Sequence, residues 1–120
     1  MSEAKSIVIV EDDFLIAEYL RVTCSELGAE VLGLASQPAE AIEMIRQMKP
    51  GYVLMDVRLG GKRDGVDVAM AIHTINPDIK IVFVTGSSEP PTIDRINMDH
   101  PHRILIKPIS PGDLADALGY

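Results

Sequence analysis

The sequence predicts an α/β fold built on one parallel sheet of five strands, with helices on both faces. Short apolar runs rich in isoleucine and valine alternate five times with segments of helical periodicity. These runs are apolar at successive residues, which is typical of strands that are covered on both sides. Right-handed connections between parallel strands then place helices on both faces of the sheet.

The expected strands are five short apolar runs, each bounded by polar residues, glycine or proline. Their β-branched residues favour extended backbone. None of the runs approaches the length that spans a bilayer, so no membrane association is expected. The five strands are Ile7–Val10, Val31–Leu34, Tyr52–Met55, Ile79–Val84 and Ile104–Ile106.

Helices are expected between the strands, because apolar residues recur there three or four positions apart. Gly28 marks the end of the first helix, Pro38 the start of the second, and Asn76–Pro77 the end of the third. The residues expected on the buried faces of these helices are Ala17, Leu20, Cys24 and Leu27, then Ala41, Ile42, Ile45 and Met48, then Val68, Ile72 and Ile75.

The last two helices differ in the clarity of their signals. Ser110–Asp113 has the pattern of a capping box with proline at the first helical position, and it predicts the start of the fifth helix. The fourth helix is expected to be short or irregular. Its segment, Glu89–Met98, has room for at most two turns after two prolines, and Asp99–His102 then interrupts it with a further proline.

The composition favours one acidic domain over residues 1–120. The formal net charge is −7 and no run of lysine or arginine breaks it, so direct contact with nucleic acid is not expected. The single cysteine, Cys24, precludes an internal disulfide and fits a reducing compartment. The first five residues lead into a strand without the apolar stretch of a signal peptide, so a cytoplasmic location is expected.

Polar residues follow four of the five expected strands. In an open parallel sheet the carboxyl ends of the strands share one edge, and ligands bind in the crevice there. Each residue alone could be a helix cap, a turn residue or a solvated lysine, but chance accounts poorly for all four strand ends together. The residues are Glu11, Asp12 and Asp13 after the first strand, Asp56 after the third, Thr85 after the fourth and Lys107 after the fifth.

Clustered carboxylates indicate a divalent cation. Two carboxylates about 4 Å apart repel each other by roughly 4 kcal/mol at an effective dielectric constant of about 20. Oxygen ligands with few protein contacts favour Mg²⁺, which retains water and binds phosphoryl oxygens. Mg²⁺ and the Lys107 ammonium can neutralise a phosphoryl group in transit, and the Thr85 hydroxyl can donate to one of its oxygens. A carboxylate is then the expected acceptor, because no cysteine or serine follows a strand in a nucleophile setting.

Five pieces of sequence, in this order and at these spacings, resemble the receiver domains of two-component response regulators over essentially the whole chain. No single piece is specific, whereas the ordered set is. The pieces are Ile7–Asp13, Leu54–Asp56, Asp64–Gly65, Val82–Thr85 and Ile106–Pro108.

The resemblance implies a sheet of order 2-1-3-4-5, as in flavodoxin-like folds, and a signalling switch controlled by phosphorylation. Asp56 would accept a phosphoryl group from a sensor histidine kinase or a histidine phosphotransfer protein, while the output partner is not specified. Such a receiver catalyses its own phosphotransfer and dephosphorylation and is not otherwise an enzyme.

The resemblance also implies a role for each site residue. Asp12, Asp56 and the backbone carbonyl of Arg58 would bind Mg²⁺ directly, and Glu11 would bind it through water. Thr85 and Lys107 would be the switch hydroxyl and the phosphate-binding cation, and the peptide bond from Lys107 to the next residue, a proline, would be cis. The third acidic residue after the first strand, Asp13, is assigned to the cap of the first helix.

Three features depart from the usual receiver pattern. Leu59–Arg63 makes the loop after the acceptor one residue longer and glycine-rich, and Gly86 stands where alanine is usual. Ile104 replaces the aromatic switch residue of the last strand. Together with the short fourth helix, these features weakly resemble an alphaproteobacterial subset of receivers. They leave the phosphorylation chemistry in place and alter the usual output surface.

Two other functions fit these residues less well. A phosphorylation-independent adaptor with the same fold would not need the complete acidic, hydroxyl and lysine set. A flavodoxin-like cofactor binder would need a glycine- or serine-rich phosphate loop after the first strand, where Glu11–Asp13 would repel a phosphate unless a metal intervened.

Overall fold

A computed structural model describes residues 5–58, 65–86, 90–97 and 101–120 of the chain. All five strands run parallel, and their order in the sheet is β2-β1-β3-β4-β5, as predicted. The predicted strands are confirmed in number and order. Four strands extend the apolar runs by one polar or small residue at one or both ends, such as Glu30, because the backbone ladder continues into flanking residues. The fourth strand begins at Lys80, one residue later than predicted, and ends one residue later at Thr85. The strands are β1 (Ser6–Val10), β2 (Glu30–Ala35), β3 (Tyr52–Asp56), β4 (Lys80–Thr85) and β5 (Arg103–Ile106).

A helix follows each strand, and two of the helix starts are fixed by side chains that the sequence indicates. The Asp13 carboxylate caps the first helix by accepting hydrogen bonds from the amides of Leu15 and Ile16, at 2.9 and 3.1 Å. Ser110 and Asp113 form the predicted capping box at the last helix. The helices are α1 (Phe14–Glu26), α2 (Pro38–Met48), α3 (Gly65–Ile75), α4 (Pro90–Asn97) and α5 (Pro111–Leu118).

The fourth helix is short, as predicted, but it begins earlier than its sequence suggests. Pro90 and Pro91 are its first two residues and do not precede it. Proline is tolerated there because the first amides of a helix have no partner within the helix. Ile96 anchors the helix to the core and is completely buried.

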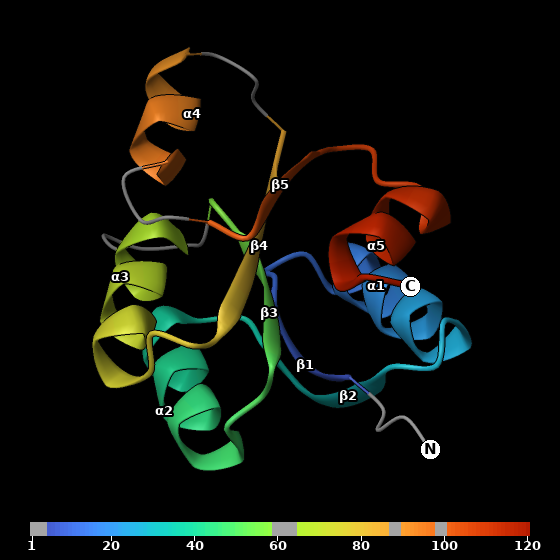
Figure 1. The fold of residues 1–120 in the computed structure, drawn as a ribbon, viewed down its shortest axis with the longest axis horizontal. Coiled ribbons are helices and arrows are strands. Elements are labelled where there is room, and N and C mark those ends of the chain that lie inside the picture. The colour runs from blue at the N-terminus through green and yellow to red at the C-terminus, as the bar shows by residue number, and fades with distance from the viewer. Residues whose placement is uncertain (1–4, 59–64, 87–89, 98–100) are drawn as a thin grey trace.

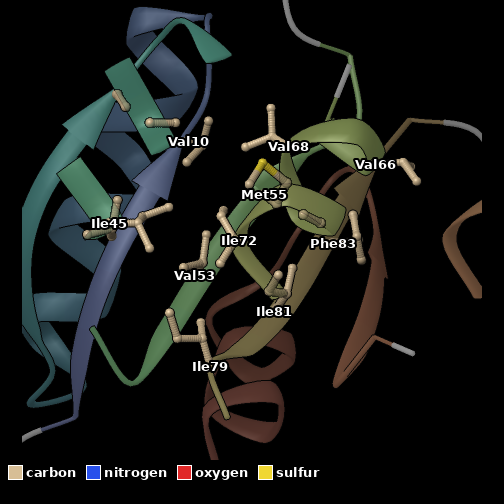
Figure 2. Packing of buried hydrophobic residues seen from close by; sticks show 14 of the residues in the cluster. Val10, Ile45, Val53, Met55, Val66, Val68, Ile72, Ile79, Ile81 and Phe83 are labelled. Carbon is tan, nitrogen blue, oxygen red and sulfur yellow. The ribbon is translucent and has the colours of Figure 1, made fainter. Parts of the chain in front are cut away.

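The helices form two layers around the sheet: α1 and α5 cover one face, and α2, α3 and α4 cover the other (Figure 1). Alternate residues of the central strands supply the two cores. Val53 and Met55 point to the α2–α3 side, where Ile45, Ile72 and Phe83 join them (Figure 2). Leu54 and its neighbours pack against Leu20, Cys24 and Leu114 on the other side. The interior of each central strand is therefore apolar at successive positions, and polar residues occur only at its ends, which explains the continuous runs.

Two residues expected on buried helix faces are half-exposed. Met48 and Ile75 keep 45% and 49% of their surface in contact with solvent. Each is the last residue of its helix, so the neighbouring layer covers only part of its side chain. The edge strands β2 and β5 are also only partly buried. Among the helices of the described residues, none combines the length and hydropathy needed to cross a membrane.

Candidate functional site

The carboxyl ends of four strands bring the predicted site residues together. Glu11 follows β1, Asp56 and Thr85 end β3 and β4, and Lys107 follows β5. Backbone hydrogen bonds extend the sheet around them: the Glu11 amide donates to the Ala35 carbonyl at 2.9 Å, and the Lys107 amide donates to the Thr85 carbonyl at 2.8 Å. Glu11, Asp56 and Thr85 are buried, whereas Lys107 is partly exposed. The sheet therefore presents these residues on fixed backbone.

Lys107 reaches across the sheet to both buried carboxylates. Its Nζ donates a hydrogen bond to Glu11 Oε1 at 3.1 Å and lies 3.6 Å from Asp56 Oδ2. The peptide bond between Lys107 and Pro108 is cis, as expected. Burial alone would lower the pKa of Lys107, but the hydrogen bond to Glu11 and the two negative charges outweigh it and raise that pKa. Lys107 is thus positively charged beside the candidate acceptor.

Three carboxylates crowd the same place. Oxygen atoms of Glu11, Asp12 and Asp56 all lie within 4.8 Å of one another. Burial first, then the hydrogen bond and the negative charge of Asp56, raise the pKa of Glu11 to about 8 against the opposing effect of Lys107. Asp12 is exposed, and its amide donates to Glu11 Oε2 at 3.1 Å. The crowding makes this end of the sheet unfavourable for a further negative charge and favourable for a cation.

These carboxylates meet the requirements of a magnesium site. All three donors are hard oxygen atoms, which Mg²⁺ prefers to nitrogen or sulfur. Burial first, and then the proximity of Asp56, disfavour the ionised form of Glu11 and raise its pKa, and a divalent cation counteracts both effects. The exposure of Asp12 leaves one side of the cluster open to water and to a ligand.

A small pocket of about 380 Å³ opens over the carboxylates. Arg58 contributes to its wall, and the Arg58 amide donates to Asp56 Oδ1 at 3.2 Å. The structure thus brings Arg58 to the site through its backbone, while its side chain is exposed. The pocket is lined by Asp12, Asp13, Ile16, Asp56, Arg58, Gly86 and Lys107. Residues 59–64, which include the long loop and Asp64, lie outside the described residues.

Gly65 has a role that the sequence pattern did not reveal. Its amide donates to the Val57 carbonyl at 2.7 Å, so α3 begins directly against the strand that ends in the candidate acceptor. A Cβ atom at this position would lie 2.0 Å from the carbonyl oxygen of Asp56. Only glycine permits such an approach of two backbones. The glycine in the Asp64–Gly65 motif was the available signal in the sequence. The reason for a glycine there is the close approach of Gly65 to the Asp56 backbone, which the sequence pattern does not show.

An apolar groove beside the site was also missed. It has a volume of about 640 Å³ and runs between α1 and the segment that follows β5. At the same end of α1, Phe14 and Leu15 are 74% and 77% exposed. Ile16, Gly86 and Lys107 line both this groove and the carboxylate pocket, so the two are adjacent. The groove is lined by Leu15, Ile16, Tyr19, Leu20, Gly86, Lys107, Pro108 and Ile109.

Comparison with known proteins places this arrangement among signalling domains. The family described as "Response regulator receiver domain" matches residues 7–119. The transcriptional regulatory protein PdtaR of Mycobacterium tuberculosis is 34% identical over 116 residues, which are 95% of this chain and 55% of that protein. The chemotaxis protein CheY of Thermotoga maritima is 26% identical over 114 residues, 95% of this chain and 94% of that one.

Solved structures agree. The signal receiver domain of a modulated diguanylate cyclase from Desulfovibrio desulfuricans superimposes with a TM-score of 0.90 at 30% identity, over 98% of this chain and 92% of that one. The chain spans about half the length of PdtaR, so the matched region is one part of that longer regulator.

Proposed function

Because the chain belongs to the response regulator receiver family, we propose that residues 1–120 form one phosphorylation-controlled switch domain whose phosphoryl acceptor is Asp56. The position of Lys107 carries the proposal, since its ammonium stands 3.6 Å from the Asp56 carboxylate and 3.1 Å from Glu11. A buried carboxylate beside a cation and an acidic cluster has the groups that phosphoryl transfer requires. A cytoplasmic setting, in which Cys24 stays reduced, fits this function.

The transfer would proceed by displacement at phosphorus. An oxygen of Asp56 forms the new O–P bond as the N–P bond of a donor phosphohistidine breaks, and the released imidazole takes a proton from solvent. Lys107 offsets negative charge on the moving group, and Thr85, at the end of the neighbouring strand, donates its hydroxyl to a phosphoryl oxygen. Hydrolysis repeats the displacement with water as the nucleophile.

Glu11, Asp12, Asp56 and the Arg58 carbonyl would hold Mg²⁺ in this function. When bound, Mg²⁺ supplies further positive charge to the phosphoryl oxygens. Without it, the crowded carboxylate oxygens of this cluster oppose the arrival of an anionic group.

The donor would be a sensor histidine kinase or a histidine phosphotransfer protein. Phe14 and Leu15 expose apolar surface beside the groove that ends at Lys107, which fits an apolar helix that carries the phosphohistidine. The same docking brings the histidine to the open side of the carboxylate pocket.

The decisive experiment is labelling with a small donor. Incubation with acetyl phosphate and Mg²⁺ should add one phosphoryl group, detected by intact-mass spectrometry as a base-labile modification. Asp56→Asn should abolish the modification and leave the circular dichroism spectrum unchanged, because asparagine has nearly the same shape. Labelling that persists in this variant would move the acceptor elsewhere, and an unlabelled wild type would favour a phosphorylation-independent adaptor.

A second experiment addresses the metal. Mg²⁺ should raise the melting temperature of the wild type by mass action, with a shift that grows with Mg²⁺ concentration. Asp12→Ala should reduce that shift strongly, and without metal this variant should melt above the wild type because one repulsive charge is gone. Equal Mg²⁺ shifts in the two proteins would exclude Asp12 as a ligand.

A further inference from the structure

The side chain of Tyr19 in α1 forms a hydrogen bond to the segment that carries Lys107. The Tyr19 hydroxyl donates a hydrogen bond to the backbone carbonyl of Ile109 at 2.8 Å, across 90 residues of sequence. Tyr19 also lines the apolar groove together with Lys107, Pro108 and Ile109. Tyr19 therefore joins the first helix directly to the segment between β5 and α5.

The Lys107 segment is held at two points, one on each side. On the sheet side, the Lys107 amide donates to the Thr85 carbonyl at 2.8 Å. Pro108 follows and has no amide hydrogen with which to extend this ladder. On the α1 side, the next residue, Ile109, is held through its carbonyl by Tyr19. The backbone that bears Lys107 thus lies between a sheet hydrogen bond and the Tyr19 hydroxyl.

We propose that Tyr19 is a positioning residue for Lys107, whose hydroxyl keeps the lysine ammonium at its place between Glu11 and Asp56. This inference rests on the proposed function, because it concerns the cation that assists phosphoryl transfer to Asp56. Lys107 has a long, flexible and partly exposed side chain, so its reach depends on where its backbone stands. A small displacement of a catalytic group reduces the rate of a reaction more than it reduces the stability of the fold.

A purely structural role for Tyr19 is the competing explanation. The residue is 43% exposed, and its ring covers part of the groove whatever its hydroxyl does. A structural role predicts that removal of the hydroxyl changes stability a little and the reaction rate not at all. A positioning role predicts a loss of rate that depends on the presence of Lys107.

The test uses Tyr19→Phe, which removes the hydroxyl alone, with Tyr120→Phe as the matched control. Tyr120 is similarly exposed, at 47%, and lies at the opposite end of the sheet, where the Lys5 Nζ is 5.1 Å from its ring centre. With acetyl phosphate as donor and Mg²⁺ saturating, Tyr19→Phe should lower the maximal labelling rate about threefold to tenfold. The KM for acetyl phosphate and the Kd for Mg²⁺ should stay within about twofold, and Tyr120→Phe should match the wild type.

A double-mutant cycle connects the effect to Lys107. In a Lys107→Ala background, Tyr19→Phe should cause no further loss, because the group that it positions is gone. A wild-type rate in Tyr19→Phe, or an equal loss in both backgrounds, would overturn the inference. If the wild type is not labelled at all, the proposed function fails, and the inference is then decided by nitrogen-15 NMR of the Lys107 ammonium. That signal should shift in Tyr19→Phe and not in Tyr120→Phe, and an unchanged signal would end the proposal.

Discussion

The two ends of the sheet place charge in opposite ways. At the carboxyl end, Glu11 and Asp56 face each other and one lysine lies between them. At the amino end, the Tyr52 ring lies between two lysines, with Lys5 Nζ 5.5 Å and Lys80 Nζ 5.4 Å from its centre. His102 meets the same ring edge-on, with centroids 5.7 Å apart.

This contrast separates stability from function. The lysines at the amino end rest on the negative face of a neutral, buried ring, so each charge finds a partner and the ring is covered. The carboxylates at the other end are crowded, and the nearby charge of Lys107 does not cancel the rise in the pKa of Glu11 that burial and Asp56 cause. Substitutions at the amino end should therefore destabilise the fold. Removal of a negative charge at the carboxyl end should stabilise it.

The largest effect is expected at the amino end. Tyr52→Ala should lower the free energy of unfolding by about 3 kcal/mol, because it removes a buried ring and two cation–π contacts together. Tyr52→Phe keeps the ring and should cost far less. Urea denaturation measures both, and a loss below about 1 kcal/mol for Tyr52→Ala would show that the lysines and His102 do not depend on the ring.

A steric substitution at the carboxyl end comes next. Gly65→Ala should destabilise the fold by about 1–3 kcal/mol, because the new Cβ would lie 2.0 Å from the Asp56 carbonyl oxygen and α3 must move away. It should also slow labelling by acetyl phosphate, since Asp56 moves with its backbone. Gly86→Ala is the control: no atom lies within 4 Å of a Cβ there, and its stability should remain within about 0.5 kcal/mol of wild type.

The pH dependence of stability should differ between the two ends, and Glu11 gives the larger part. Its pKa in the folded protein is raised from 4.5 to about 8, so the folded state binds this proton more tightly than the unfolded state. The stabilisation is complete below pH 4.5 and is lost as the pH rises through about 8. Without Mg²⁺, the wild type should lose about 1–2 kcal/mol relative to Glu11→Gln between pH 5 and pH 8. Parallel curves for the two proteins would contradict this.

His102 should give a smaller effect of opposite sign. Burial and then the positive charge of Lys80 lower its pKa below the ordinary value of 6.5, so the folded state binds this proton less tightly. The corresponding stability is present above pH 6.5 and is lost as the pH falls below it. NMR titration should show a depressed pKa for His102 that moves back toward 6.5 in Lys80→Gln. An unaltered value in that variant would remove Lys80 as a cause.

The sequence predicts the sheet, and the edge at which the candidate site residues meet, for a definite reason. Strand positions, helix caps and strand ends depend on local patterns: Asp13 caps the helix that it precedes, and Asp56 ends the strand that presents it. The strand order is implied by the resemblance to receiver domains. Parallel topology then brings the strand ends together without further information. The roles assigned to Thr85, Arg58 and the other site residues remain predictions until labelling and metal binding are measured.

What the sequence could not predict depends on contacts between distant segments. The bond from Tyr19 to Ile109 and the approach of Gly65 to Asp56 each join parts of the chain that no local pattern connects. The cluster around Tyr52 draws Lys5 and Lys80 from the starts of two other strands. In the sequence these lysines are far apart, so they form no basic run. In the folded chain both lie over the ring of Tyr52.

The contact between Lys5 and the last helix has a consequence for chain connectivity. Lys5, which leads into β1, donates a hydrogen bond to the Leu118 carbonyl at the end of α5. Residues 5 and 118 are therefore neighbours in space, although β1 lies inside the sheet between β2 and β3. A short linker could join them, with new ends opened at the turn around Pro77 between α3 and β4. The fold is thus compatible with circular permutation, because its stabilising contacts do not require that the chain begin with β1.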